Sequence, residues 1–185
     1  QLRAYADQDT AARLNNPVFH IHGHNVPASN MVVPFAMLLN LAAVSAAEDK
    51  ARLWGFIGRY APEASPETHP DLDAAAGFAV AYYNDFVKPT REFRLPDDQE
   101  RAAMADLLER LKDWDEGADA DALQSMVFAV GKDHGFDPLR AWFKALYEVC
   151  LGASQGPRFG GFIALYGVDE TIKLIEKGLA GELAG

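Results

Sequence analysis

The sequence predicts an all-α fold, a helical bundle or cage of about seven or eight helices. Apolar residues recur every three or four positions along most of the 185 residues, which is the spacing of one face of a helix. Clusters of Pro, Gly and Asp interrupt this spacing at intervals that suit helices of ordinary length. Hydrophobic residues make up 49% of the chain, which is enough to build a sizeable core.

The first half of the chain is expected to hold two long helical stretches. Ser29 or Asn30 can cap a helix through VVPFAMLLNLAAVSA, and helical spacing continues in EDKARLWGFIGRY. The segment APEASPETHP, with its three prolines, breaks the pattern. A further helix is expected over 71–87, where one stripe carries Phe78, Tyr82 and Phe86. KPTREFRLP then forms a connector.

The second half begins with a helix start signal. Asp97 and Glu100 form the pattern of a capping box, and the apolar face of the helix that follows reaches Trp114. DEGADAD is an acidic turn, and Asp119 can cap the next helix.

Two more helices are expected after that. Asp137 followed by Pro138 predicts a helix start that ends near Gly152. The loop ASQGPRFGG leads into FIALYG, and the apolar residues of the last helix are spaced by four, three, four and four: Val168, Ile172, Ile175, Leu179 and Leu183.

Composition and charge exclude several classes of protein. The net charge of −10 argues against a general nucleic-acid coat and against DNA binding, while it leaves room for a local basic face. No run of about 18 apolar residues is present, so no membrane span is expected. Cys150 is the only cysteine, which excludes a disulfide within the chain and suits a buried thiol in a cytoplasmic protein. The polar start without Met is interpreted as part of a longer gene product.

The stretch HIHGH places His20, His22 and His24 at alternate positions. In an extended segment the three rings would share one side and could bind zinc, but no fourth ligand and no HExxH pairing lies nearby. The HIGH signature of class I aminoacyl-tRNA synthetases requires a strand-to-helix junction in a nucleotide-binding domain, whereas the residues after position 30 predict only helices. We therefore expect a linker and no metal.

No catalytic constellation can be identified in the sequence. There is no Walker A segment and no nucleophile elbow, and Cys150 lies on a predicted apolar helix face. The carboxylates between Asp97 and Asp121 have the pattern of a solvated face. We expect no catalytic residue and no cofactor within this chain.

Basic residues next to aromatic residues are the remaining candidates for a binding site. They lie in the connector, around GKDHGFDPLRAWFK and in the loop QGPRFGG. Arginine and lysine bind phosphates, and arginine also stacks on unpaired bases. The alternative is that they are ordinary surface cations. The candidates are Lys88, Arg91, Arg94, Lys132, Arg140, Lys144, Arg158 and Phe159.

Several long segments together resemble one family. NPVFHIHG, LLNLAAVSAAEDKARLWGFI, YNDFVKPTREFR and WFKALYEVCLG followed by GPRFGGFIALYG are similar to the C-terminal portion of class I lysyl-tRNA synthetases. The last of these segments also resembles the end of the glutamyl-tRNA synthetase anticodon-binding region. The likeness covers nearly the whole chain.

The resemblance implies a role in lysine–tRNA ligation. Full-length members activate lysine with ATP and magnesium and transfer it to lysine tRNA, while this part, without the catalytic domain, would be inactive alone. Residues 1–30 would be a connector after the absent catalytic domain of the same polypeptide, 31–115 a helical connecting lobe, and 116–185 the anticodon-binding lobe.

Within that role, the candidates divide by the part of the tRNA they would meet. Arg158 and Phe159 in the loop, with Lys132, Arg140 and Lys144 beside it, would contact anticodon bases. Backbone groups of the loop from Ser154 to Gly161 would read uracil edges. The remaining three cations, Lys88, Arg91 and Arg94, would meet backbone phosphates.

One alternative of another class stays open. A non-catalytic helical module could bind a basic protein partner through the acidic face between Asp97 and Asp121.

Overall fold

All regular secondary structure in the described part of the chain is helical. The computed structural model describes residue 5 and residues 8–23, 31–47, 49–115, 117 and 119–184. These residues contain ten α-helices and no strand, so the all-α prediction is confirmed. The helices outnumber the predicted seven or eight because two short ones, α2 (Thr10–Leu14) and α3 (Pro17–His22), lie in a segment that we expected to be a connector.

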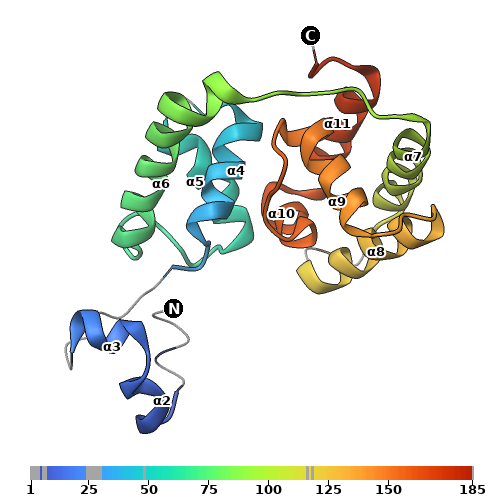
Figure 1. Ribbon diagram of the computed structural model, residues 1–185. Helices are drawn as coiled ribbons and strands as arrows, with labels where there is room; N and C mark the ends of the chain where they lie inside the picture. The colour runs from blue at the N-terminus through green and yellow to red at the C-terminus, as the bar shows by residue number, and fades with distance from the viewer. Residues whose placement is uncertain are drawn as a thin grey trace.

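A first group of helices contains α4, α5 and α6 (Figure 1). The π-helical segment η1 and the 3-10 turn η2 continue α6 towards a linker over 91–97. In this group Asp73 of α6 accepts hydrogen bonds from Lys50 and from the indole of Trp54, both on α5. The bounds are Phe35–Ser45 for α4, Lys50–Tyr60 for α5, Pro70–Tyr82 for α6, Tyr83–Val87 for η1 and Lys88–Thr90 for η2.

A second group follows the linker and contains α7, α8, α9, α10 and α11. The π-helical segment η3 extends α9, and a loop leads from it to α10. The bounds are Asp98–Lys112 for α7, Ala120–Asp133 for α8, Arg140–Leu146 for α9, Tyr147–Leu151 for η3, Phe159–Tyr166 for α10 and Val168–Ala180 for α11.

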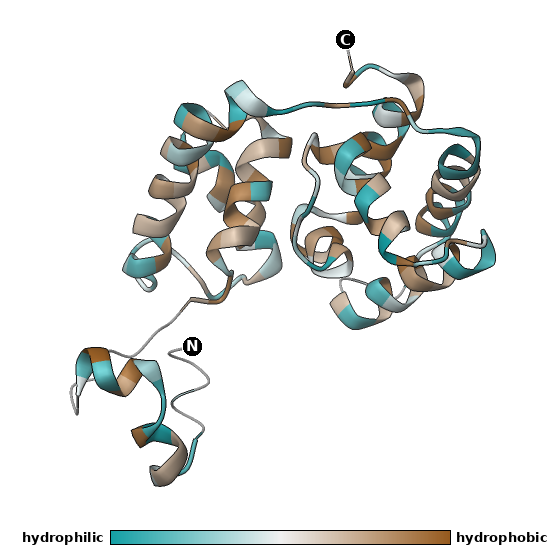
Figure 2. Cartoon of the chain, viewed as in Figure 1, coloured by the Kyte–Doolittle hydropathy of each residue, from teal (hydrophilic) through white to brown (hydrophobic). Residues whose placement is uncertain are grey.

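The two groups share one hydrophobic core, and α10 lies at their junction. This helix contacts α8 and α11 of its own group and also α4 and α5 of the first group. The ring centroids of Tyr166 on α10 and Phe56 on α5 are 5.2 Å apart. A helix that is apolar on all sides has to be buried on all sides. Figure 2 shows the mainly apolar colour of α10, and this helix is buried along almost its whole length.

Glycines allow the helices of the second group to approach closely. A Cβ on Gly160 of α10 would lie 2.4 Å from the backbone nitrogen of Gln124 on α8. The side chain of Gln124 accepts a hydrogen bond from the Gly160 N–H at 2.8 Å, so this contact also fixes the start of α10. A Cβ on Gly131 of α8 would lie 2.5 Å from the indole ring of Trp142 on α9.

The predicted helix starts are partly confirmed. Asp97 and Glu100 form the complete capping box of α7, and Asp119 caps α8. Asp137 does not cap a helix: α9 begins at Arg140 after Leu139, whose side chain makes no capping bond. A turn through Asp137 and Pro138 separates α8 from α9, and the sequence pattern alone does not distinguish such a turn from a cap.

The aromatic stripe on α6 faces outward. Phe78 and Tyr82, with Phe86 on η1, are exposed. The buried side of α6 is formed by small and aliphatic residues instead: Leu72, Ala76, Ala79 and Val80. Small side chains allow α6 to pack closely on α4 and α5. From residue size alone, the aromatic side of α6 would have been expected to face the core, and the structure shows the opposite.

Cys150 lies in η3 with no exposed area. Burial raises the pKa of its thiol to about 12. The expected burial of the thiol is confirmed, and a raised pKa disfavours the reactive thiolate.

The histidines of HIHGH do not form an extended row. His20 and His22 lie on α3, where residues two apart project about 200° from each other, so the two rings cannot share a side. His24 lies outside the described residues. Groups of three or more potential metal ligands do not occur among the described residues.

The contacts between helices indicate where the boundary between the two lobes lies. The predicted boundary near residue 115 puts α7 with the first lobe, whereas α7 contacts α8, α9 and α11. We infer that the linker over 91–97 is the better boundary. The described residues include no helix long and apolar enough to cross a membrane.

Candidate nucleic-acid interface

A groove of about 530 Å³ lies between α9 and the loop that follows η3. We call the loop over 152–157 the glycine loop, because Gly152 and Gly156 shape it. The groove is lined on one side by α9 and on the other by the glycine loop, and its lining residues are Pro138, Arg140, Ala141, Phe143, Lys144, Tyr147, Ser154, Gln155 and Gly156.

Tyr147 fixes the glycine loop at two points. The hydroxyl of Tyr147 donates a hydrogen bond to the Pro157 carbonyl at 2.5 Å, and its own carbonyl accepts one from the Ala153 N–H at 3.2 Å. A Cβ on Gly156 would lie 2.7 Å from the Tyr147 ring, so a larger residue would push the loop away. Burial raises the pKa of the Tyr147 phenol, so the hydroxyl stays protonated as a donor at neutral pH.

The linker holds the start of the same loop. Gly152 has a φ of +62°, a conformation that favours glycine, and its carbonyl accepts a hydrogen bond from the Glu92 N–H at 3.2 Å. A Cβ on Gly152 would lie 3.1 Å from the ring of Phe93. The glycine loop is therefore fixed at both ends by contacts with η3 and with the linker.

The middle of the glycine loop presents unpaired peptide groups. Among the described residues, Ser154, Gln155 and Gly156 make no hydrogen bond with another part of the chain. All three are exposed and line the groove. Peptide N–H and C=O groups can pair with the edges of unpaired bases, so a fixed loop of this kind can read a base without a dedicated side chain.

Arg140 and Lys144 are the two sequence-predicted cations that line this groove. They lie four residues apart on α9 and therefore on one face of the helix. The ammonium of Lys144 is 3.4 Å from Glu148 and its side chain is 58% exposed, while Arg140 has no ion pair among the described residues. Both side chains can therefore reach phosphates beside the glycine loop.

Arg91 is partly buried, and two of its donors are bound within the chain. Its Nε donates to the Leu151 carbonyl and its NH1 donates to the Ala43 carbonyl, both at 2.9 Å. The guanidinium also lies 4.4 Å from the centroid of the Phe93 ring. Burial lowers the pKa of Arg91. Arg91 thus connects the end of α4 with the end of η3. Since Leu151 directly precedes the glycine loop, this contact also helps to hold the start of that loop.

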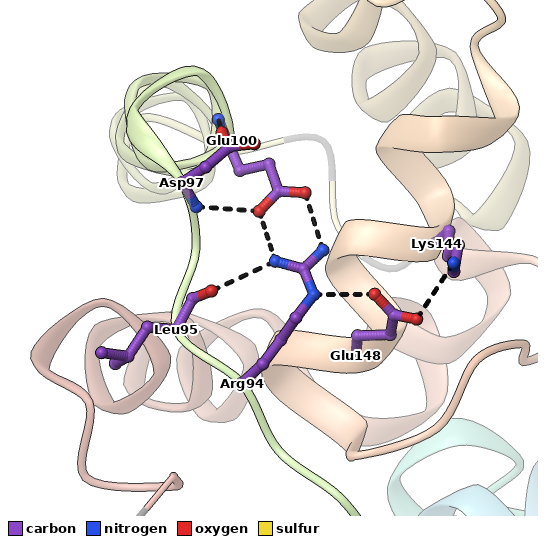
Figure 3. Close-up of polar contacts among 6 residues, drawn as sticks. All are labelled: Arg94, Leu95, Asp97, Glu100, Lys144 and Glu148. Carbon is purple, nitrogen blue, oxygen red and sulfur yellow. Dashed lines mark hydrogen bonds and ion pairs between the residues drawn. The ribbon is translucent and has the colours of Figure 1, made fainter.

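Arg94 is bound by two carboxylates (Figure 3). Its NH1 and NH2 donate to both oxygens of Glu100 at 2.5 and 2.7 Å, and its Nε donates to Glu148 at 2.7 Å. Glu100 also accepts the Asp97 N–H, so Arg94 joins the linker, the capping box of α7 and η3. The hydrogen bonds to Arg94 lower the pKa of both glutamates, and those to Glu100 raise the pKa of Arg94. A phosphate would have to displace these carboxylates.

The Arg94 cluster predicts acid sensitivity. Glu100 and Glu148 have folded pKa values below the ordinary 4.5, so their contribution to stability is present above that pH and is lost as the pH falls through the lowered values. We expect Arg94→Met to destabilise the chain at neutral pH, and the difference from the unmodified chain to shrink as the pH falls below 4.5 and through the lowered pKa values. Urea unfolding at a series of pH values measures this difference, and a difference that stays constant with pH would contradict the expectation.

Arg158 and Phe159 have different surroundings although they are adjacent. Arg158 is 70% exposed and its guanidinium is 3.1 Å from Asp121 on α8. Phe159 has no exposed area, and its ring lies 5.5 Å from that of Phe162 and 6.1 Å from that of Tyr147. Phe159 is a core residue that cannot stack on a base in this structure, so we leave it out of the proposed interface.

The last two candidates lie away from the groove. Lys132 is exposed in the last turn of α8, at the opposite end from Asp121 and its partner Arg158. Lys88 is exposed on η2. Neither lines the groove beside the glycine loop. The structure therefore brings Arg140 and Lys144 together with one side of that loop. Arg91 and Arg94 line a second groove, of about 560 Å³, with Gly152 to Gln155 on another side of it.

Sequence reasoning missed three residues that shape the site. Tyr147 anchors the glycine loop, Phe143 lines the groove, and Glu148 connects Lys144 with Arg94. All three lie on the helix expected to present an apolar face. The hydroxyl of Tyr147, ten residues before Pro157, was the available signal, but its partner depends on how the loop folds back.

Comparison with curated proteins shows what the chain is related to. A lysine–tRNA ligase of Roseobacter denitrificans is 69% identical to it over 183 residues, which are 99% of this chain and 34% of the relative. The chain is a homologue of part of lysine–tRNA ligase. The ligases of Rickettsia bellii and Rickettsia felis are 44% and 43% identical over 176 and 173 residues, covering 95% and 93% of this chain. No family model and no solved structure matches.

The ligase matches confirm the resemblance to lysyl-tRNA synthetases. The chain spans about a third of the length of the curated ligases it matches. About two thirds of a lysine–tRNA ligase therefore has no counterpart in this sequence.

Proposed function

We propose that the chain is the C-terminal, anticodon-binding part of a class I lysine–tRNA ligase. The observation that carries the proposal is the groove beside the glycine loop, where two exposed cations lie next to unpaired peptide groups. The homology to lysine–tRNA ligases supports lysine tRNA as the nucleic acid. In this proposal, residues 1–30 connect to the catalytic domain of the same polypeptide, which uses ATP and magnesium in the cytoplasm.

The chemistry of the groove suits a single-stranded loop of RNA. Anticodon bases are unpaired, so their edges are open to the peptide groups of Ser154, Gln155 and Gly156. Arg140 and Lys144 lie where they can bind the phosphates that flank those bases. The lysine anticodon has uridines at two positions, and a uracil edge offers one N–H donor and two carbonyl acceptors for the loop to pair with.

The roles of the other candidates follow from their contacts. Arg158, exposed beside Asp121, can approach the RNA from the other end of the loop, and Lys132 and Lys88 can meet more distant phosphates. Arg91 and Arg94 hold the glycine loop and the linker in place. An acidic chain can still bind RNA in this way, because a local patch of cations determines the potential that the phosphates meet.

Neutralising the groove cations tests the proposal. We expect the double variant Arg140→Gln and Lys144→Gln to bind lysine tRNA at least roughly tenfold more weakly, a loss of about 1.4 kcal/mol. The slope of log affinity against log salt should fall by about 1.4, because each cation that meets a single-stranded phosphate contributes about 0.7. Fluorescence anisotropy of labelled tRNA at several salt concentrations measures both quantities.

The control removes two positive charges from a different helix. Lys173 and Lys177 are also exposed and four residues apart, on α11, so Lys173→Gln with Lys177→Gln should leave tRNA affinity nearly unchanged. An equal loss in the two double variants, or equal binding of the unmodified chain to an unrelated tRNA, would overturn the proposed site. Binding of a basic protein with no binding of tRNA would favour the interaction module instead.

A further inference from the structure

We propose that the aromatic stripe on α6 is a docking surface for the part of a lysine–tRNA ligase that lies outside this chain. The stripe consists of Phe78, Tyr82 and Phe86, which are 69%, 47% and 62% exposed. The inference rests on the ligase homology within the proposed function, and it does not depend on where the RNA binds.

The three rings lie along one side of the helix. Each is four residues from the next, so all three lie on the same side of α6 and η1. The rings of Tyr82 and Phe86 contact each other, with centroids 5.1 Å apart. Single exposed apolar residues are common on soluble proteins, but a row of aromatic residues along two helical turns is typical of an interaction site.

The opposite side of α6 is already covered. Leu72, Ala76, Ala79 and Val80 pack into the core against α4 and α5. A helix that is apolar on both sides is typical of one that is covered on both sides. α6 lies at the edge of the first group, on the far side from α7 to α11, so the second group does not cover the stripe (Figure 1).

The charges beside the stripe argue against RNA as its occupant. Asp71 and Asp85 each lie seven residues from Phe78, two turns along the helix, and therefore on the same side as the stripe. Both are exposed, and neither has an ion pair among the described residues. Carboxylates repel phosphates, so the surface suits a protein partner with apolar residues and a basic rim.

The length of the relatives supports one partner over the others. The ligase of Roseobacter denitrificans has about two thirds of its length outside the region that this chain matches. A covalently joined segment is present at an effective concentration of about a millimolar when the linker is short. It therefore competes strongly with a second copy of the chain, which would have to associate from dilute solution.

Hydroxyl-radical footprinting tests the docking surface. Side-chain oxidation is compared between this chain alone and a chimera in which the chain replaces the homologous third of the Roseobacter denitrificans ligase. We expect oxidation of Phe78, Tyr82 and Phe86 to slow several-fold in the chimera, while Phe128, which is 40% exposed in the second group, oxidises at the same rate in both.

Matched substitutions in the chimera strengthen the test. Phe78→Ser with Phe86→Ser should return the oxidation rate of Tyr82 to its value in the chain alone, whereas Phe128→Ser should not. An unchanged rate for the stripe in the chimera overturns the proposal. Slow oxidation of the stripe in the chain alone also overturns the proposal. If this protection depends on protein concentration, a second copy covers the stripe; if it does not, a segment of this chain covers it. The tRNA titration is separate, so loss of RNA binding leaves this result standing.

Discussion

Replacing Gly160 with alanine is expected to destabilise the fold by at least about 3 kcal/mol. The added Cβ would lie 2.4 to 2.6 Å from the backbone of α8, at the nitrogen and Cα of Gln124 and the carbonyl oxygen of Ala120. Backbone atoms cannot rotate away as a side chain can, so α10 and α8 would have to separate. The hydrogen bond from Gly160 to Gln124 would lengthen at the same time.

The neighbouring glycine provides the control for this substitution. A Cβ on Gly161 would lie 3.3 Å from the terminal methyl of Met37, which is the flexible end of a side chain. Alanine also favours the helical conformation over glycine by up to about 1 kcal/mol, so Gly161→Ala should change stability by no more than about 1 kcal/mol in either direction. Urea unfolding followed by circular dichroism measures both variants, and equal losses would show that the approach of α10 to α8 is not the tight contact described.

Arg91→Met is expected to cost about 3 kcal/mol of stability. Methionine retains part of the apolar stem but cannot donate to the carbonyls of Ala43 and Leu151, which face this guanidinium from α4 and η3. The stacking on Phe93 would be lost as well. Arg91→Lys should give an intermediate loss, because an ammonium group does not reproduce the fixed fork that spans both carbonyls.

Arg101 offers a matched comparison for Arg91. Its NH1 also donates to a backbone carbonyl, that of Leu179, at 2.9 Å, but this bond is exposed. We therefore expect Arg101→Met to cost less than about 1 kcal/mol. Chemical unfolding of both variants checks the difference. Equal effects would indicate that the bonds of Arg91 add no more than a surface hydrogen bond does.

The sequence predicted the fold class well because local signals agreed. The capping box at Asp97, the cap at Asp119 and the glycine after η3 each act within one helical turn, so their partners could be identified from spacing alone. The direction of the α6 stripe could not be predicted, because both sides of that helix are apolar. Which side faces the core depends on how closely α4 and α5 approach, and that information lies elsewhere in the chain.

The candidate site could be predicted only in part, for a related reason. Spacing placed Arg140 and Lys144 on one face, and the glycines marked the loop beside them. The same cation-rich pattern did not show that Arg91 and Arg94 are held by groups of the chain itself. Glu100 lies only six residues after Arg94, but the other partners lie 48, 60 and 54 residues away in sequence. For Arg91 both partners are distant in sequence, so no local motif shows whether this arginine supports a loop or binds a ligand.

The buried state of Cys150 makes chemical labelling of this chain selective. Burial raises the pKa of this thiol to about 12 and leaves it no exposed area, so very little thiolate is present at neutral pH to react with a maleimide. A cysteine introduced at Ser154 would therefore carry a dye or a spin label alone, with the native thiol left in place. The glycine loop can in this way report on its own contacts with RNA.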